Sequence, residues 1–122
     1  MQRLTTLLPG FAAVAAMAFG SVGSAQAAAP SLFGTVGPGF TISLKDGHGG
    51  AVKTLKAGRY TISVRDRASI HDFHLSGPGV DKTITAVGFV GTKSITVTLK
   101  KGTYRYQCDP HATFMHGSFK VS

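Results

Sequence analysis

Apolar and polar residues alternate with a period of two along several short segments between Phe40 and the end of the chain. This alternation is typical of half-buried β-strands. The clearest segments are marked by the alternating positions Phe40, Ile42 and Leu44; Tyr60, Ile62 and Val64; Ile95, Val97 and Leu99; Tyr104, Tyr106 and Cys108; and Phe119 and Val121. No helix of ordinary length is expected in this part of the chain. The pattern therefore predicts an all-β protein.

Turn-forming residues separate the predicted strands at fairly regular intervals. They lie at residues 46–50, 56–58, 77–79 and 100–102. Short strands at such spacing favour a Greek-key β-sandwich or barrel over an open sheet, which would leave more strand edges unpaired. The stretch 81–92 mixes β-branched residues with two glycines and fits either a bulged strand or a loop that crosses between sheets.

The first 27 residues have the features of a secretory signal peptide. A positively charged start is followed by an apolar stretch from Leu4 to Phe19 and by the small residues Ala25, Gln26 and Ala27. A proline and a glycine interrupt the apolar stretch, which favours a cleaved signal over a permanent membrane anchor. We therefore expect an exported, periplasmic protein with no stable membrane insertion. Residues 28–122 are long enough for one compact domain and too few for two.

The predicted mature chain is strongly basic. Removal of Arg3 with the signal leaves twelve lysines and arginines against five aspartates, a net charge of +7, compared with +8 for the full chain. Such a charge favours encounters with acidic partners. No nucleic-acid partner is expected, because the basic residues are spread along the chain without a basic helix or a nucleic-acid-binding motif.

The only cysteine, Cys108, lies three residues before His111 and seven before Met115. A lone cysteine cannot close an internal disulfide, and by itself it could equally be an inert buried residue or form an intermolecular bond. Strand periodicity points Cys108 toward the core. A thiolate and a thioether suit copper, above all Cu(I), and imidazole suits both copper oxidation states, whereas calcium and magnesium prefer oxygen. The cluster therefore indicates a copper site.

A second imidazole ligand must come from elsewhere, and the segment SIHDFHLSGPG offers His71 and His74. In a strand, His71 shares its face with the apolar Phe73 and Leu75, whereas His74 lies on the opposite face with Asp72. This parity favours His71 as the ligand, with His74 as the alternative.

Taken together, these residues resemble the plastocyanin, pseudoazurin and amicyanin group of cupredoxins. The resemblance is carried by His71-Asp72, by the run from Tyr106 to His111, and by Met115-His116-Gly117. It implies an eight-stranded Greek-key sandwich with a type 1 blue copper centre. In that centre His71, Cys108 and His111 form a trigonal set around copper, and Met115 is the weak axial ligand.

Two positions depart from the pattern of this group. Asp72 stands where Asn is usual, and its negative charge is expected to favour Cu(II) and lower the reduction potential. Three residues separate His111 from Met115, one fewer than in plastocyanin and pseudoazurin and one more than in amicyanin. This spacing leaves His116 as an alternative axial ligand.

The resemblance implies a one-electron carrier that cycles between Cu(I) and Cu(II) and has no catalytic residues. His111 is then expected near the surface, in an apolar patch where electrons leave. We expect a monomer that docks on an acidic face of its redox partner. The alternative function is non-redox copper storage or delivery. A cysteine hydrolase is disfavoured because no orienting group or oxyanion donor is evident, and structural zinc sites usually contain more Cys and His.

Overall fold

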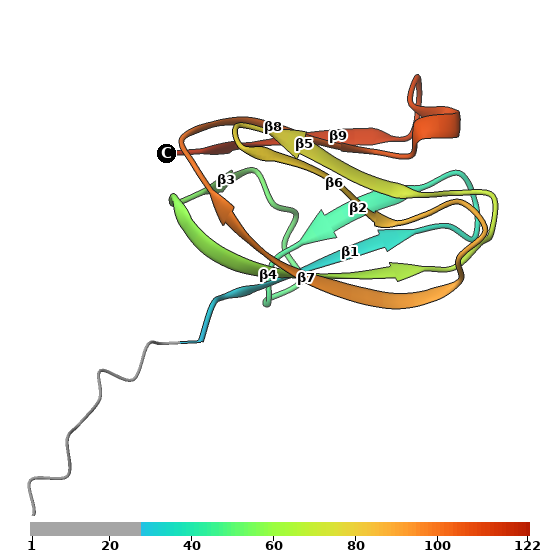
Figure 1. Cartoon of the computed structure of the whole chain (residues 1–122), viewed down its shortest axis with the longest axis horizontal. Helices are drawn as coiled ribbons and strands as arrows, with labels where there is room; N and C mark the ends of the chain where they lie inside the picture. Colours follow the sequence, from blue (N-terminus) through green and yellow to red (C-terminus); the bar gives the residue numbers. More distant parts are fainter. Residues whose placement is uncertain (1–27) are drawn as a thin grey trace, which may run out of the picture.

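The computed structural model describes residues 28–122, which form two β-sheets packed face to face (Figure 1). The predicted signal peptide, residues 1–27, lies outside the described residues. None of the helical segments among residues 28–122 is long and apolar enough to cross a membrane. The architecture confirms the predicted all-β sandwich.

The first sheet contains four strands in the order β2-β1-β4-β7. β1 and β4 run parallel, whereas β2 and β7 pair antiparallel with β1 and β4 on the two sides. The bounds are β1 (Ser31–Val36), β2 (Ile42–Lys45), β4 (Gly58–Asp66) and β7 (Gly91–Leu99).

The second sheet contains five strands in the order β3-β9-β8-β5-β6. All its pairs are antiparallel except that of β3 with β9. The bounds are β3 (Thr54–Leu55), β5 (Phe73–Gly77), β6 (Val80–Thr85), β8 (Gly102–Gln107) and β9 (His116–Val121). The chain passes to the second sheet for β3, returns for β4, passes over for β5 and β6, returns for β7, and passes over again for β8 and β9.

The core lies between the two sheets and is filled by the inward side chains of both. In the second sheet, the Tyr104 and Phe119 rings stack with centroids 5.3 Å apart, and the Phe73 and Tyr106 rings stack at 5.6 Å. Aromatic pairs of this kind bury large apolar areas and add a specific attraction. The first sheet contributes the fully buried side chains Leu32, Val36, Leu44, Ile62 and Val64.

Residues 28–122 contain nine strands, where the resemblance implied about eight. The periodicity did not reveal β1, because Gly34 occupies one of its inward positions. A Cβ at Gly34 would come within 2.9 Å of the Phe73 ring, so the core has no room for the apolar side chain that would have completed the pattern. The stretch 81–92 contains most of β6, a turn and the start of β7. Phe73 pairs with Thr85 and His74 with Thr83, so β6 has one extra residue, Ile84, as the bulged-strand alternative predicted.

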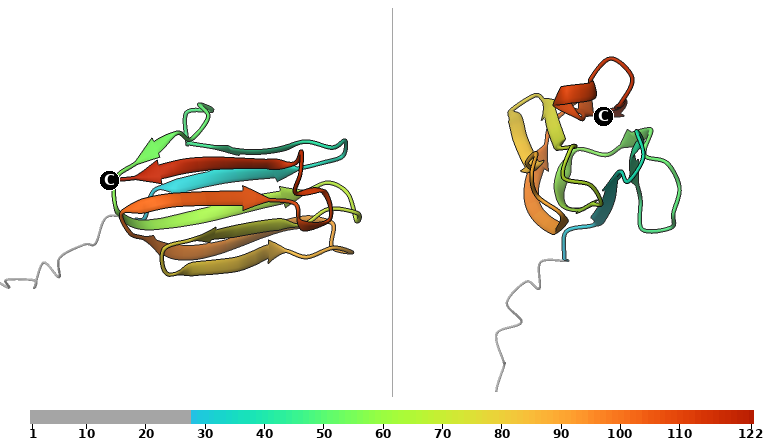
Figure 2. Two further views of the ribbon diagram at one scale, coloured as in Figure 1. Left: turned by 90° about the horizontal axis from the view of Figure 1, so that it is seen from above. Right: turned by 90° about the vertical axis from the view of Figure 1, so that its right-hand side faces the viewer.

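Three loops meet at one end of the sandwich, opposite the end at which the chain terminates (Figure 2). They are residues 37–41 after β1, residues 67–72 before β5, and residues 108–115 between β8 and β9. The register requires this arrangement, because Val36 pairs with Asp66 at the ends of β1 and β4, and Gln107 pairs with His116 at the start of the third loop. We call this the ligand end of the molecule.

Candidate metal centre

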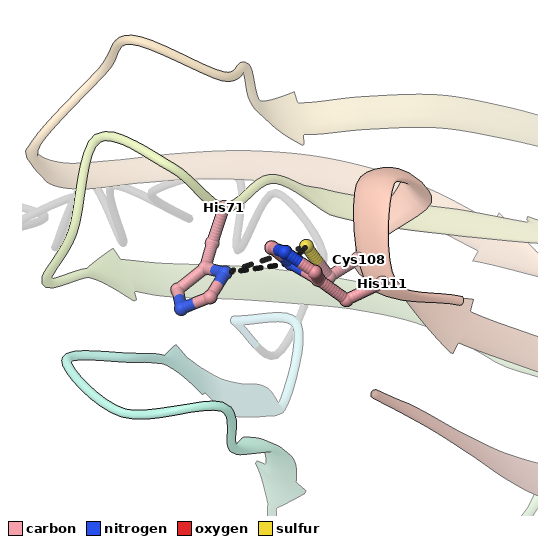
Figure 3. A group of neighbouring side chains, drawn as sticks. All are labelled: His71, Cys108 and His111. Atoms are coloured by element: carbon pink, nitrogen blue, oxygen red, sulfur yellow. Dashed lines mark hydrogen bonds between the residues drawn. The ribbon is translucent and has the colours of Figure 1, made fainter. Parts of the chain in front are cut away.

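Three side chains from two of these loops point toward one another at the ligand end (Figure 3). The Cys108 Sγ lies 3.6 Å from the Nδ1 of His71 and 3.5 Å from the Nδ1 of His111, and the two Nδ1 atoms are 3.2 Å apart. Cys108 and His71 are buried, and His111 is partly exposed. No other group of His, Cys, Asp or Glu that could hold a metal ion occurs among residues 28–122.

The ring of His71 is fixed by the first loop. Its Nε2 lies 2.9 Å from the carbonyl oxygen of Gly39 and can donate a proton to it. With the proton on Nε2, the Nδ1 keeps its lone pair and directs it at the other two donors. Metal-binding histidines are typically oriented in this way by a hydrogen bond from the second ring nitrogen.

The third loop is a compact turn held by its own backbone. It begins with a short 3₁₀ helix, η1 (Asp109–His111), in which the fixed φ of Pro110 suits the first turn. The N–H of Cys108 donates to the Met115 carbonyl at 3.0 Å, and the N–H of His111 donates to the Cys108 carbonyl at 3.0 Å. These bonds bring Cys108 and His111 to one side of the loop.

Met115 and His116 lie on opposite sides of the chain. Met115 is 1% exposed and belongs to the same core cluster as Cys108. His116 is exposed, and its Nδ1 lies 2.9 Å from the carbonyl oxygen of Ala112, to which it can donate. Met115, not His116, therefore accompanies Cys108 on the buried side of the loop.

The environment of the thiol disfavours a free thiolate. Burial raises the pKa of Cys108 above its ordinary value, although the backbone N–H groups of Asp72 and His111 act in the opposite direction. A nearby cation would reverse this balance, because metal binding requires the deprotonated sulfur and stabilises it. A thiolate with two imidazoles and a buried thioether alongside is a donor set that fits copper.

Comparisons with known proteins agree with this donor set. The model of a family described as copper-binding proteins of the plastocyanin/azurin family matches residues 62–122, half of the chain. The chain belongs to this family. Membership confirms the predicted relationship to cupredoxins and gives copper as the cofactor, and the cluster is consistent with one type 1 ion. The narrower assignment to the plastocyanin, pseudoazurin and amicyanin group stays a prediction.

Solved structures of rusticyanin, another cupredoxin, share the fold. Rusticyanin from Thiobacillus ferrooxidans superimposes with a TM-score of 0.52 at 24% identity, over 75% of this chain and 76% of that chain. A methionine-to-glutamine mutant of rusticyanin gives a TM-score of 0.55 at 23% identity over the same shares. No curated protein matches the chain significantly.

Beside the cluster of this copper protein lies a buried carboxylate. Asp72 is 4% exposed, and its Oδ1 accepts the backbone N–H of Asp109 at 2.6 Å. Burial raises the pKa of Asp72, and the hydrogen bond from Asp109 opposes that rise. Asp72, the residue after His71, thus joins the second loop to the third at Asp109, the residue after Cys108.

An aromatic group covers the partly exposed His111. The Phe40 ring lies edge-on to His111 and His71, with centroids 5.0 and 5.5 Å away, and Phe114 lies 5.6 Å from His111. Phe40 and Phe114 are 58% and 59% exposed, so the surface around His111 is apolar.

Sequence reasoning missed the role of Phe40. The alternation with Ile42 and Leu44 assigned Phe40 to a strand, but it precedes β2 and lies in the first loop. The available signal was that Phe40 directly follows Gly37-Pro38-Gly39, a run of residues typical of turns.

The second candidate histidine of the sequence, His74, lies outside the cluster. Its Nδ1 is 2.9 Å from Asp109 Oδ1, and its Nε2 is in contact with Asp81 Oδ1. Both ring nitrogens of His74 are therefore engaged by carboxylates on the outer face of the second sheet.

Proposed function

We propose that residues 28–122 form a single exported domain that carries one electron at a time through a type 1 copper ion. The proposed ligands are His71, Cys108 and His111, with Met115 in the axial position. The observation that carries the proposal is the convergence of one thiol and two Nδ1 atoms, 3.2 to 3.6 Å apart, at the end of a β-sandwich. Bound copper would supply the change between Cu(I) and Cu(II).

The residues around the cluster suit electron transfer because they limit movement of the donors. The Gly39 carbonyl holds His71, the backbone of the third loop holds Cys108 and His111, and Asp72 joins the two loops. A shell that is already in place needs little rearrangement when its charge changes. This limited rearrangement favours the role of an electron carrier.

His111 is the proposed exit for the electron. It is the most exposed of the three clustered donors, and the exposed Phe40 and Phe114 rings beside it can exclude water when a partner docks. We further propose that the partner presents an acidic face and that the carrier is a monomer. The net positive charge would then speed the encounter, with a rate that falls as salt rises.

Voltammetry of the copper-loaded protein tests this proposal. A carrier should give a reversible one-electron wave and should keep its metal in the presence of a chelator. Irreversible or absent voltammetry, together with rapid loss of copper to the chelator, would instead indicate the alternative function of copper storage or delivery.

A further inference from the structure

His74 lies between two carboxylates on the outer face of the second sheet. Its Nδ1 is 2.9 Å and 3.1 Å from the two carboxylate oxygens of Asp109, and its Nε2 contacts Asp81 Oδ1. A neutral imidazole has only one N–H, so it can donate to only one of these carboxylates. The geometry fits the imidazolium form, which donates to both.

The surroundings favour this charged form. The hydrogen bond to Asp81 contributes most to raising the pKa of His74 above its ordinary value, partial burial opposes the rise, and Asp109 adds to it. The side chain of His74 is 24% exposed and that of Asp81 is 80% exposed, so solvent weakens each ion pair.

Asp109 is the residue through which this arrangement reaches the copper ligands. It directly follows Cys108, its N–H donates to Asp72, and its Oδ1 also accepts a hydrogen bond from the side chain of Gln107 at 2.8 Å. Arg105 in turn donates to the Gln107 side chain and to the Ala112 carbonyl. The outer face of the sheet therefore binds the third loop at Asp109 and at Ala112, on either side of His111.

We propose that His74 is a positioning residue whose imidazolium links Asp81 on β6 to Asp109 in the third loop, and so holds Cys108 and His111 in place for copper. We call these three residues the His74 bridge. The inference rests on the proposed copper site but adds a residue that contacts no copper ligand through its ring nitrogens.

The bridge predicts a definite pH dependence. Because the pKa of His74 is raised by folding, its contribution is complete below about pH 6.5, the ordinary value for histidine, and is lost as the pH rises through the raised value. The other charged or titratable side chains on this face of the sheet and in the loop are Asp81 on β6, Arg105 on β8, Asp109 in the loop, and His116 and Lys120 on β9.

The test compares His74→Gln and Asp81→Asn with the wild type. Asp81→Asn weakens the bridge without changing any residue of the third loop. The matched control is His48→Gln, which changes an exposed histidine of the β2–β3 loop. Below pH 6.5, both bridge variants should lose copper to excess chelator roughly three to five times faster than the wild type, as expected for an ion pair near the surface. This ratio should approach one at higher pH, and His48→Gln should match the wild type throughout.

A second measurement uses the metal-free protein. Hydrogen exchange at the Asp109 amide, which donates to Asp72, should accelerate several-fold in both bridge variants and not in His48→Gln. Unchanged exchange, or faster copper loss to the same degree at every pH, would overturn the proposal. If the wild type forms no copper–thiolate centre, the proposed function fails, and amide exchange still decides whether the bridge holds the loop.

Discussion

The two ends of the sandwich treat their buried polar groups in opposite ways. At the end away from the ligands, the Tyr104 hydroxyl donates to the Pro78 carbonyl at 2.8 Å and accepts the N–H of Lys100 at 2.9 Å. The hydroxyl and both backbone groups there have a partner within the chain. At the ligand end, a sulfur and two Nδ1 atoms converge at distances of 3.2 to 3.6 Å, a donor set of the kind that binds a transition-metal ion. The first arrangement contributes to stability, whereas the second is the proposed copper site.

Exposed apolar side chains are distributed just as unevenly. Among residues 28–122, only one exposed large apolar residue lies away from the loops and turns of the ligand end, namely Phe33 on β1. The others at or beside that end are Phe40, Ile70, Val87, Val90 and Phe114. Clustered exposed apolar residues commonly mark an interaction surface. The contrast between the ends therefore separates a stabilising region from the region proposed to bind metal and a partner.

The largest expected effect comes from removing an imidazole at the ligand end. In copper-loaded protein, His71→Ala should abolish the visible Cu(II)–thiolate band, because one of the three converging donors is lost. His74→Gln should still form the band, because His74 lies outside the cluster. Absorption spectra of the two variants decide this, with circular dichroism as the check on folding. A band that survives His71→Ala and disappears in His74→Gln would reverse the assignment.

The next effect is on stability and concerns the opposite end. Tyr104→Phe removes the hydroxyl that pairs with Pro78 and Lys100. It should lower the free energy of unfolding by about 2 kcal/mol, since two buried backbone groups lose a partner. Chemical denaturation measures this loss. The copper band should keep its position and intensity, and a shifted band would show that the two ends are not independent.

A smaller effect is expected from the charge of Asp72. Asp72→Asn keeps an oxygen that can accept the Asp109 N–H but removes a negative charge that favours Cu(II). The reduction potential should rise by roughly 50 mV, or about 1 kcal/mol for one electron, the scale of a screened charge several ångströms away. Asp46→Asn, which removes an equal charge from the β2–β3 loop, is the control for voltammetry. Equal potentials in Asp72→Asn and the wild type would contradict this role.

Much of the fold followed from alternation because most inward positions are large and apolar. Alternation failed where tertiary contacts decide the residue, as at Gly34, which makes room for Phe73. It also misplaced Phe40, because an apolar residue that packs on His111 from a loop continues the same alternation as one in a strand.

The positions of the site residues were only partly accessible from the sequence. Parity placed His71 toward the core, and the structure buries it beside Cys108, but His71 precedes β5 and the adjacent Asp72 is buried as well. Strict alternation does not hold in a loop. The Gly39 carbonyl that orients His71 could not be predicted. Every residue has a backbone carbonyl, so the sequence does not show which one lies beside the His71 ring.

The absorption and electron paramagnetic resonance spectra of the copper-loaded protein test the central claim most directly. The account predicts an intense visible band from Cu(II)–thiolate charge transfer in the wild type and no such band in Cys108→Ser. Bound copper without the band, or a band that persists in Cys108→Ser, would contradict it.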